Sequence, residues 1–231
     1  IAIGLQLYAG KDFPFYTSTM GQEIFPAYIS RRFEKQYIAT NTIKAVIEDL
    51  YPDKSQGLPL VEQMVEKGKY WWLQDKLLPE TADSIKTGFT AKQVEWVKDN
   101  EGVVWNLILQ NDHLYSMEPG IIQMYIGDAP GIQGFPPAAP GNVGQWIGKK
   151  IVENYVEKNP TITPVELMKK TSREILDGVS PATRELWRRA DVPHPAAPAT
   201  CHRRNRALAR AALPARTHRP PPTFAKRRWQ A

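Results

Sequence analysis

The sequence predicts a mainly α fold, with one helical domain and a minor N-terminal strand. Apolar residues recur every three or four positions through most of residues 41–178, which is the period of an amphipathic helix. Two of these stretches follow a Thr-x-x-Gln or Thr-x-x-Glu pattern, which is typical of helix starts. The chain has 231 residues and 42% hydrophobic content, enough for one sizeable core. It contains no run of about 18 apolar residues that would span a bilayer.

The first forty residues combine several signals. Residues 1–10 alternate and contain branched side chains, which favours a short strand. Residues 11–26 carry Pro14 and Pro26 among aromatic side chains, which favours a loop. Residues 27–37 favour a short helix. The first residue is Ile rather than Met, so we expect the chain to begin inside a longer protein whose targeting segment precedes it.

Two helices are expected between residues 41 and 79. The first has Asn41 or Thr42 as its N-cap and stops before Pro52. The second runs from Pro59, which suits the first helical position, to Pro79. The apolar face of the first helix comprises Ile43, Val46, Ile47 and Leu50.

Two later stretches begin with a capping box, in which an N-cap Thr and a Glu or Gln three residues later exchange hydrogen bonds. Thr90 and Gln93 begin one helix that continues to about residue 110. Thr163 and Glu166 begin a single helix that ends at Gly178. The apolar set of the first of these helices is Val94, Val97, Val104, Trp105 and Ile108.

Between these stretches, a short helix is expected at 119–126, and a Gly/Pro-rich loop follows it. A longer helix is expected over residues 142–159, with Gly144 and Gly148 on its apolar face. Each interior glycine costs a helix about 1 kcal/mol relative to alanine. We therefore expect another element to approach the helix closely at these two glycines.

Lys67 and Asp75 are unusual on the helix of residues 59–79, because both fall within the arc that carries its apolar side chains. An unpaired buried charge costs several kcal/mol, so each side chain needs a partner or a path to solvent. In one interpretation, both residues line a polar cleft inside the domain. In the other, Lys67 extends its amine from the edge of the arc to water and Asp75 caps a neighbouring helix. Lys67 and Asp75 are the candidate cleft residues.

The positive charge of the chain belongs to its C-terminal end. Residues 192–231 hold nine Lys and Arg and no Asp or Glu, which leaves 21 basic and 24 acidic residues before them. This segment also replaces Lys by Arg and is rich in Ala and Pro. We expect residues 179–231 to be a disordered basic tail. Two explanations are open: a natural extension that binds nucleic acid, or a non-native sequence read from another frame after a seam at 179–191.

The sequence predicts no catalytic, metal or cofactor site. Zinc hydrolysis needs a pattern such as His-Glu-x-x-His, but the only histidine before the tail is His113. Cys201 and His202 lack a second pair of ligands, and no Gly-x-Ser-x-Gly motif or phosphate-binding loop is present. The aromatic residues occur at helical spacing, which favours core packing over a base-stacking surface. They include Trp71, Trp72, Trp96, Trp105, Trp146 and Tyr155.

Several segments together resemble the gliding-motility lipoprotein GldB family of Bacteroidetes. They are "IGLQLYAGKDFPFY", "ISRRFEKQYI", "LVEQMVEKGKYWWLQDKLLPETADSIKTGFTAKQVEWVKDNEGVVW", "NDHLYSMEP" and "PGNVGQWIGKKIVENYVEKNP". Their order and spacing match, and the resemblance covers about residues 1–178. The family itself is distantly similar to predicted zinc peptidases, which implies a degenerate zincin-like fold. A Glu-Gly pair of those peptidases reads Lys67-Gly68 here, and no histidine precedes His113, so catalysis does not carry over.

The resemblance implies a non-enzymatic lipoprotein component of gliding motility and type IX secretion, with protein partners in that machinery. It also implies an N-terminal lipid anchor outside this sequence and a place at the periplasmic face of the outer membrane. Two alternatives remain open from the residues. One is a zinc metallopeptidase-like hydrolase, and the other is a nucleic-acid-binding protein that acts through the tail.

Overall fold

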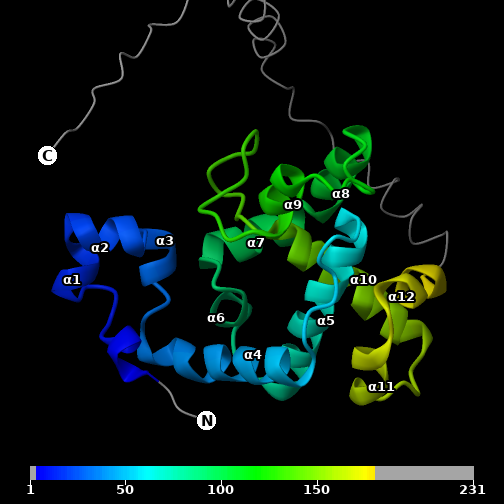
Figure 1. Ribbon diagram of the computed structural model, residues 1–231, viewed down its shortest axis with the longest axis horizontal. Coiled ribbons are helices and arrows are strands. Elements are labelled where there is room, and N and C mark those ends of the chain that lie inside the picture. The colour runs from blue at the N-terminus through cyan, green and yellow to red at the C-terminus, as the bar shows by residue number, and fades with distance from the viewer. Residues whose placement is uncertain (1–3, 180–231) are drawn as a thin grey trace, which may run out of the picture. The chain divides into compact units, whose positions relative to one another are not determined.

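The computed structural model describes residues 4–179, and over these residues every regular element is a helix (Figure 1). The prediction of a mainly α fold is confirmed. Residues 1–3 and 180–231, which include almost all of the expected tail, lie outside the described residues. The elements are η1 (Leu5–Tyr8), α1 (Pro14–Thr17), α2 (Thr19–Ile24), α3 (Ala27–Ser30), η2 (Lys35–Tyr37), α4 (Ile38–Leu50), α5 (Leu60–Leu77), α6 (Asp83–Thr87), α7 (Ala91–Asp99), α8 (Glu101–Gln110), α9 (Pro119–Ile126), α10 (Val143–Lys158), α11 (Pro164–Lys169) and α12 (Ser172–Gly178).

The two longest helices, α5 and α10, cross at the centre of the domain with their backbones in contact. A Cβ atom added to Gly148 would lie 1.7 Å from the carbonyl oxygen of Met64, and one added to Gly68 would lie 2.2 Å from the carbonyl carbon of Gly148. The close approach expected at Gly144 and Gly148 is confirmed. Glycine is required here because any side chain would push the two helices apart.

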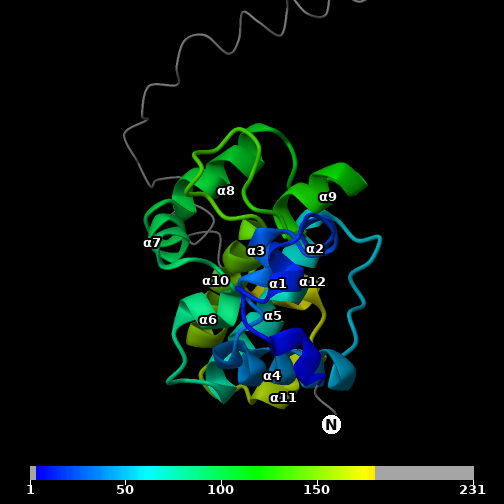
Figure 2. The same ribbon diagram turned by 90° about the vertical axis from the view of Figure 1, so that its left-hand side faces the viewer.

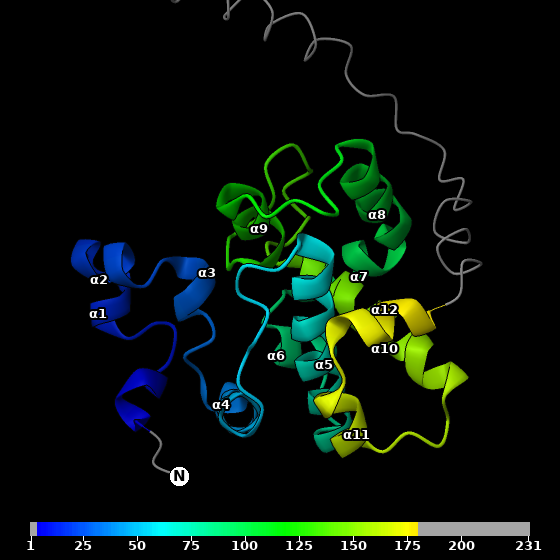
Figure 3. The same cartoon turned by 45° about the vertical axis from the view of Figure 1, so that its right-hand side comes forward.

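The remaining helices surround this pair. Figures 1 and 2 show α8 and α9 near one end of α5, and α4 and α11 near the other. Figure 3 shows α11 and α12 beside α5, which they contact. The α4–α5 connection and the α11–α12 junction therefore both lie next to α5, although more than 100 residues separate them in the chain.

The core is continuous along α5 and α10 and takes in the aromatic residues of the helical stretches. Trp71, Trp72, Trp105, Trp146 and Tyr155 are at most 7% exposed, as expected for core packing. Trp96 is partly buried and packs edge-on against Phe135. Because aromatic side chains bury large areas, these residues supply much of the apolar surface that holds the domain together.

The N-terminal expectations are partly wrong. No strand occurs in the described residues, and the expected strand at 1–10 is replaced over residues 5–8 by η1, where the Leu7 amide donates to Gly4. A short alternating stretch forms a strand only when a partner strand is available, and the helical neighbours offer none. The expected loop at 11–26 forms α1 and α2, with Ser18 capping α2. The expected helix at 27–37 is divided into α3 and η2.

The helix expected from residue 41 begins earlier, at Ile38, because η2 runs directly into it. Asn41 is therefore not a cap, and its side-chain amide donates to the Tyr8 hydroxyl instead. The helix starts at Thr90 and Thr163 are confirmed, and both expected capping boxes are formed, whereas Pro59 is the N-cap of α5 rather than its first helical residue. The short helix at 119–126 and the helix over 142–159 are confirmed as α9 and α10.

Two helices that were expected to be continuous are broken. Asn100 ends α7, where its side-chain amide donates to the Trp96 carbonyl, and the Asn100 carbonyl then accepts the amide of Val104 in α8. The single helix expected over 163–178 is α11 and α12, because Lys170 and Thr171 are extended. Thr171 forms a third capping box with Glu174 that starts α12.

Candidate functional site

Lys67 and Asp75 point to different partners and do not meet in one cleft. The Lys67 amine lies 2.8 Å from the Asp53 carboxylate in the α4–α5 connection. Asp75 lies between the amines of Lys86 in α6 and Lys149 in α10, with 2.5 Å to Lys86. The side chains of both candidate residues are about one quarter exposed. Each therefore joins α5 to a neighbouring element.

Asp75 belongs to a charge cluster around Trp146. The Trp146 indole donates to Glu101 at 2.7 Å, and the Lys149 and Lys150 amines lie 5.2 and 5.4 Å from its ring centroid. The cluster contains four carboxylates and four amines, so its net charge is zero. Its charged members are Asp75, Asp83, Glu101, Glu153, Lys86, Lys98, Lys149 and Lys150. A balanced, interconnected cluster of this kind fixes α6, α8 and α10 against α5.

Lys67 holds the α4–α5 connection in place. Asp53 accepts hydrogen bonds from the Ser55 amide at 2.8 Å and the Ser55 hydroxyl at 2.6 Å, in addition to the ion pair with Lys67. Burial alone would raise the pKa of Asp53, but the hydrogen bonds from Lys67 and Ser55 hold it below its usual value. The Tyr70 hydroxyl also donates to the Tyr51 carbonyl at 2.7 Å, and burial raises the pKa of Tyr70. The connection therefore forms a fixed wall beside α5.

This wall, the facing side of α5 and the α11–α12 junction enclose a pocket of about 510 Å³, which we call the Lys69 pocket. That volume lies in the range of small-molecule and peptide side-chain sites. The end of α4 contributes Leu50, and the connection contributes Tyr51, Pro52, Lys54 and Leu58. The α5 helix contributes Glu62, Glu66 and Lys69, and the junction contributes residues 168–173.

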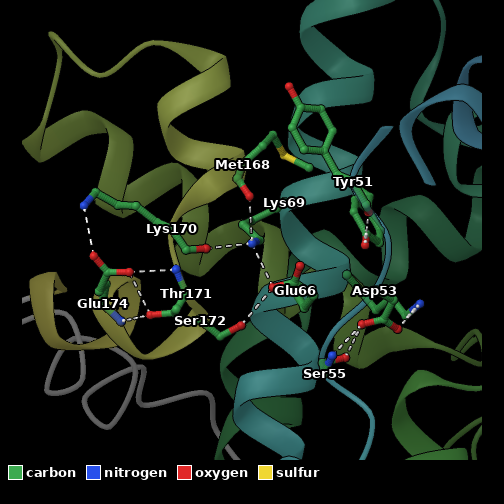
Figure 4. Close-up of polar contacts among 12 residues, drawn as sticks. Tyr51, Asp53, Ser55, Glu66, Lys69, Met168, Lys170, Thr171, Ser172 and Glu174 are labelled. Atoms are coloured by element: carbon green, nitrogen blue, oxygen red, sulfur yellow. Dashed lines mark hydrogen bonds and ion pairs between the residues drawn. The ribbon is translucent and has the colours of Figure 1, made fainter. Parts of the chain in front are cut away.

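Lys69 occupies the floor of the pocket and is only 2% exposed. Its amine lies 2.8 Å from Glu66 and donates to the carbonyl oxygens of Lys170 at 2.9 Å and Met168 at 3.4 Å (Figure 4). An ammonium group has three N–H donors, and these three contacts use all of them. Met168 lies in the last turn of α11 and Lys170 follows it, so neither carbonyl has an amide four residues on in the same helix, and the buried amine satisfies both.

Glu66 completes the floor. Its carboxylate accepts the Ser172 hydroxyl at 3.1 Å, next to the contact with Lys69 (Figure 4). Ser172 is 4% exposed, and Glu66 is 9% exposed. The three side chains form a closed set of contacts in which Lys69 donates, Glu66 accepts and Ser172 donates. The arrangement joins α5 to α12, and it leaves the Lys69 amine without a lone pair that would act as a base toward Ser172.

The rim of the Lys69 pocket is basic. Lys54 comes from the α4–α5 connection, and Lys169, Lys170 and Arg173 come from the α11–α12 junction. Glu62 is the single acidic residue at the rim, because Glu66 is paired on the floor. The rim therefore carries an excess of three positive charges. This excess distinguishes the pocket from the balanced cluster around Trp146.

His113 and the acidic residues form no metal centre in residues 4–179. The His113 imidazole contacts the hydroxyl of buried Tyr125 at 3.1 Å, and no group of three or more His, Cys, Asp or Glu side chains in this range is placed to hold a metal ion. The pair Cys201 and His202 lies outside the described residues. Within the same range, no helix is both long enough and apolar enough to cross a membrane.

Reasoning from the sequence missed the Lys69 pocket. Lys69 and Glu66 also lie on α5 among apolar residues. The pattern predicted Lys67 and Asp75 instead, because those two fall within the apolar arc. One signal was available: Thr171 and Glu174 have capping-box spacing. That spacing predicts a new helix start at Thr171, and therefore a break within residues 163–178. Carbonyl oxygens at such a break need hydrogen-bond donors from elsewhere in the fold.

Comparison with protein families matched a model described as gliding motility protein GldB over residues 1–179. The match covers more than three quarters of the chain and ends where the described residues end. Comparison with curated proteins and with solved structures found no match.

Proposed function

This chain belongs to the gliding motility protein GldB family, and from that premise we propose that it is a non-catalytic lipoprotein component of a gliding apparatus linked to type IX secretion. The family assignment makes it a gliding-motility-associated protein. The lipoprotein character, the link to secretion and the absence of catalysis are the proposed parts.

The contacts on the floor of the Lys69 pocket support a non-catalytic role. A serine nucleophile needs a nearby base that takes its proton, and Ser172 instead donates to a carboxylate that is held by Lys69. Lys69 in turn is fully engaged by Glu66 and two backbone carbonyls. These groups hold α12 against α5, and an interaction component needs a fixed surface of this kind.

We further propose that the protein acts in the cell envelope, at the periplasmic face of the outer membrane. The support is the family's description as lipoproteins, and the proposed anchor is a lipid on a residue that precedes this sequence. Its partners would then be other proteins of the gliding and secretion machinery.

Deletion of the gene, followed by complementation, tests this proposal. Deletion should abolish cell movement on glass and colony spreading, and it should also deplete secreted cargo from the culture medium. The wild-type gene should restore all three, and density-gradient fractionation should place the protein with the outer membrane. A deletion strain that glides normally would contradict the motility role, and normal secretion would remove the link to type IX secretion.

The substitution Ser172→Ala tests the non-catalytic part. It removes one hydrogen bond to Glu66, so the variant should accumulate normally and restore gliding. Normal accumulation without gliding would indicate a chemical role for the hydroxyl and would contradict the proposal. Elemental analysis of the purified chain tests the metallopeptidase alternative, which no observation on the described residues supports. Stoichiometric zinc that survives mild chelation would favour that alternative.

A further inference from the structure

We propose that the Lys69 pocket binds an acidic, partly apolar peptide segment of a protein partner, through carboxylates that pair with its basic rim. This inference rests on the proposed role as an interaction component and names the surface and the class of partner. Three features of the pocket support it: the charges at its rim, the neutrality of its floor and the chemistry of its walls.

The rim cations lack strong partners. No carboxylate of residues 4–179 lies within ion-pair distance of Lys54 or Lys169. Lys170 lies 3.4 Å from Glu174, and Arg173 lies 3.6 Å from Asp177, each one helical turn away on the exposed face of α12. Exposed pairs of this kind contribute about 0.3–0.5 kcal/mol, so an incoming carboxylate can replace them at little cost.

The floor does not compete for such a ligand. Lys69 and Glu66 neutralise each other, and the remaining donors of Lys69 go to the Met168 and Lys170 carbonyls. The unmatched charge therefore lies at the rim, which is accessible, and not at the buried floor. A carboxylate that enters from solvent meets the cations before it loses its own hydration, and this lowers the desolvation cost of binding.

The walls favour a peptide over a bare anion. Leu50 is 65% exposed, and Leu58 and Met168 also line the pocket, so both the α4–α5 side and the α11 side offer some apolar surface. Glu62 lines the α5 side, and it disfavours a compact phosphate, which concentrates roughly two negative charges, more than it disfavours a single carboxylate. A carboxylate beside an apolar side chain matches both kinds of surface. A peptide segment presents that combination along its length, and a volume of about 510 Å³ accommodates a few of its side chains.

An NMR titration of the full chain with a short peptide tests the inference. The probe is acetyl-Glu-Leu-Asp-Leu-Glu-amide at up to millimolar concentration and low salt, and the matched control is its uncharged analogue, acetyl-Gln-Leu-Asn-Leu-Gln-amide. The acidic peptide should shift the amide signals of Lys54, Leu58, Lys169, Lys170 and Arg173. Residue-specific signals separate this site from any binding by the basic residues of 192–231.

Charge-reversal variants supply the control for general electrostatics. The double variant K169E/R173E should weaken peptide binding at the pocket at least tenfold, and both residues are exposed, so the fold should persist. The variant K35E/K92E makes the same change in net charge at two exposed lysines on η2 and α7, and it should bind as the wild type does.

Three outcomes would overturn the inference. The first is no shift at the pocket, and the second is equal weakening by both double variants. The third is a stronger response of the same signals to inorganic phosphate or to a DNA oligonucleotide at equal concentration. The titration uses purified protein and the gliding assay uses cells, so a failure of the site and a failure of the motility role remain distinguishable.

Discussion

The crossing of α5 and α10 predicts that Gly148→Ala destabilises the protein strongly. The added Cβ would lie 1.7 Å from the Met64 carbonyl oxygen, whereas ordinary contact begins at 3.4 Å. The atom it meets is backbone, so no side chain can rotate away. The helices must separate by about 1.7 Å, the difference between these two distances, or bend to the same effect.

The expected magnitude follows from two opposing effects. Alanine is better than glycine in a helix by about 0.5–1 kcal/mol. Overpacking costs about 1–3 kcal/mol or more, and a gap of only about 0.5–1 Å already removes a quarter to a half of the dispersion energy between facing atoms. Because the clash is with backbone at the centre of the core, we expect an overpacking cost above the usual range, about 4 kcal/mol, and therefore a net loss of about 3 kcal/mol. For a chain of this size that corresponds to a fall in Tm of roughly 6–12 °C.

Urea unfolding followed by tryptophan fluorescence measures this loss, and Gly120→Ala is the matched control. Gly120 is in α9, is exposed, and a Cβ there meets only the Glu118 side chain at 4.0 Å. Gly120→Ala should leave the free energy of unfolding unchanged or raise it slightly. If Gly148→Ala proves as stable as Gly120→Ala, the two helices do not cross with their backbones in contact at Gly148.

Three further predictions concern other parts of the molecule. Lys69→Met leaves the buried Glu66 without its cation and should lower the free energy of unfolding by about 3–5 kcal/mol, and Glu66→Gln in the same chain should recover part of this loss in urea unfolding. The lowered pKa of Asp53 means that its pairing with Lys67 stabilises the fold fully above about pH 4 and progressively less as the pH falls through the folded-state pKa. The stability difference between wild type and Lys67→Met should therefore be present at pH 7 and shrink as the pH falls below the folded-state pKa of Asp53, and a difference that does not change with pH would refute the ion pair. A chain that ends at Val179 should keep the circular dichroism and Tm of the full chain and lose its salt-sensitive binding to nucleic acid, and unfolding on truncation would show that the tail is native structure.

The candidate site was predictable only in part. The sequence correctly marked α5 as a helix with charged residues among its apolar ones, and it required those charges to have partners. It could not say which partners, because Lys67 pairs with Asp53 fourteen positions away and Lys69 with carbonyls about 100 positions away. Periodicity describes one helix at a time, whereas the partners of a buried charge come from every element packed around it.

The sequence by itself determined the helical class, the starts of α5, α7, α9, α10 and α11, and the positions of close packing. These features depend on local chemistry: a threonine that caps a helix with a residue three positions later, a proline that suits the first turn, and a glycine that has no other justification inside a helix. The tertiary structure decided where long helices break and where charges meet. The α11–α12 break is stable because Lys69 of α5 satisfies the carbonyls at the junction, and the basic rim forms because that junction and the connection after α4 line the same pocket. Both results need contacts between segments distant in the chain, and local sequence preferences carry no information about those contacts.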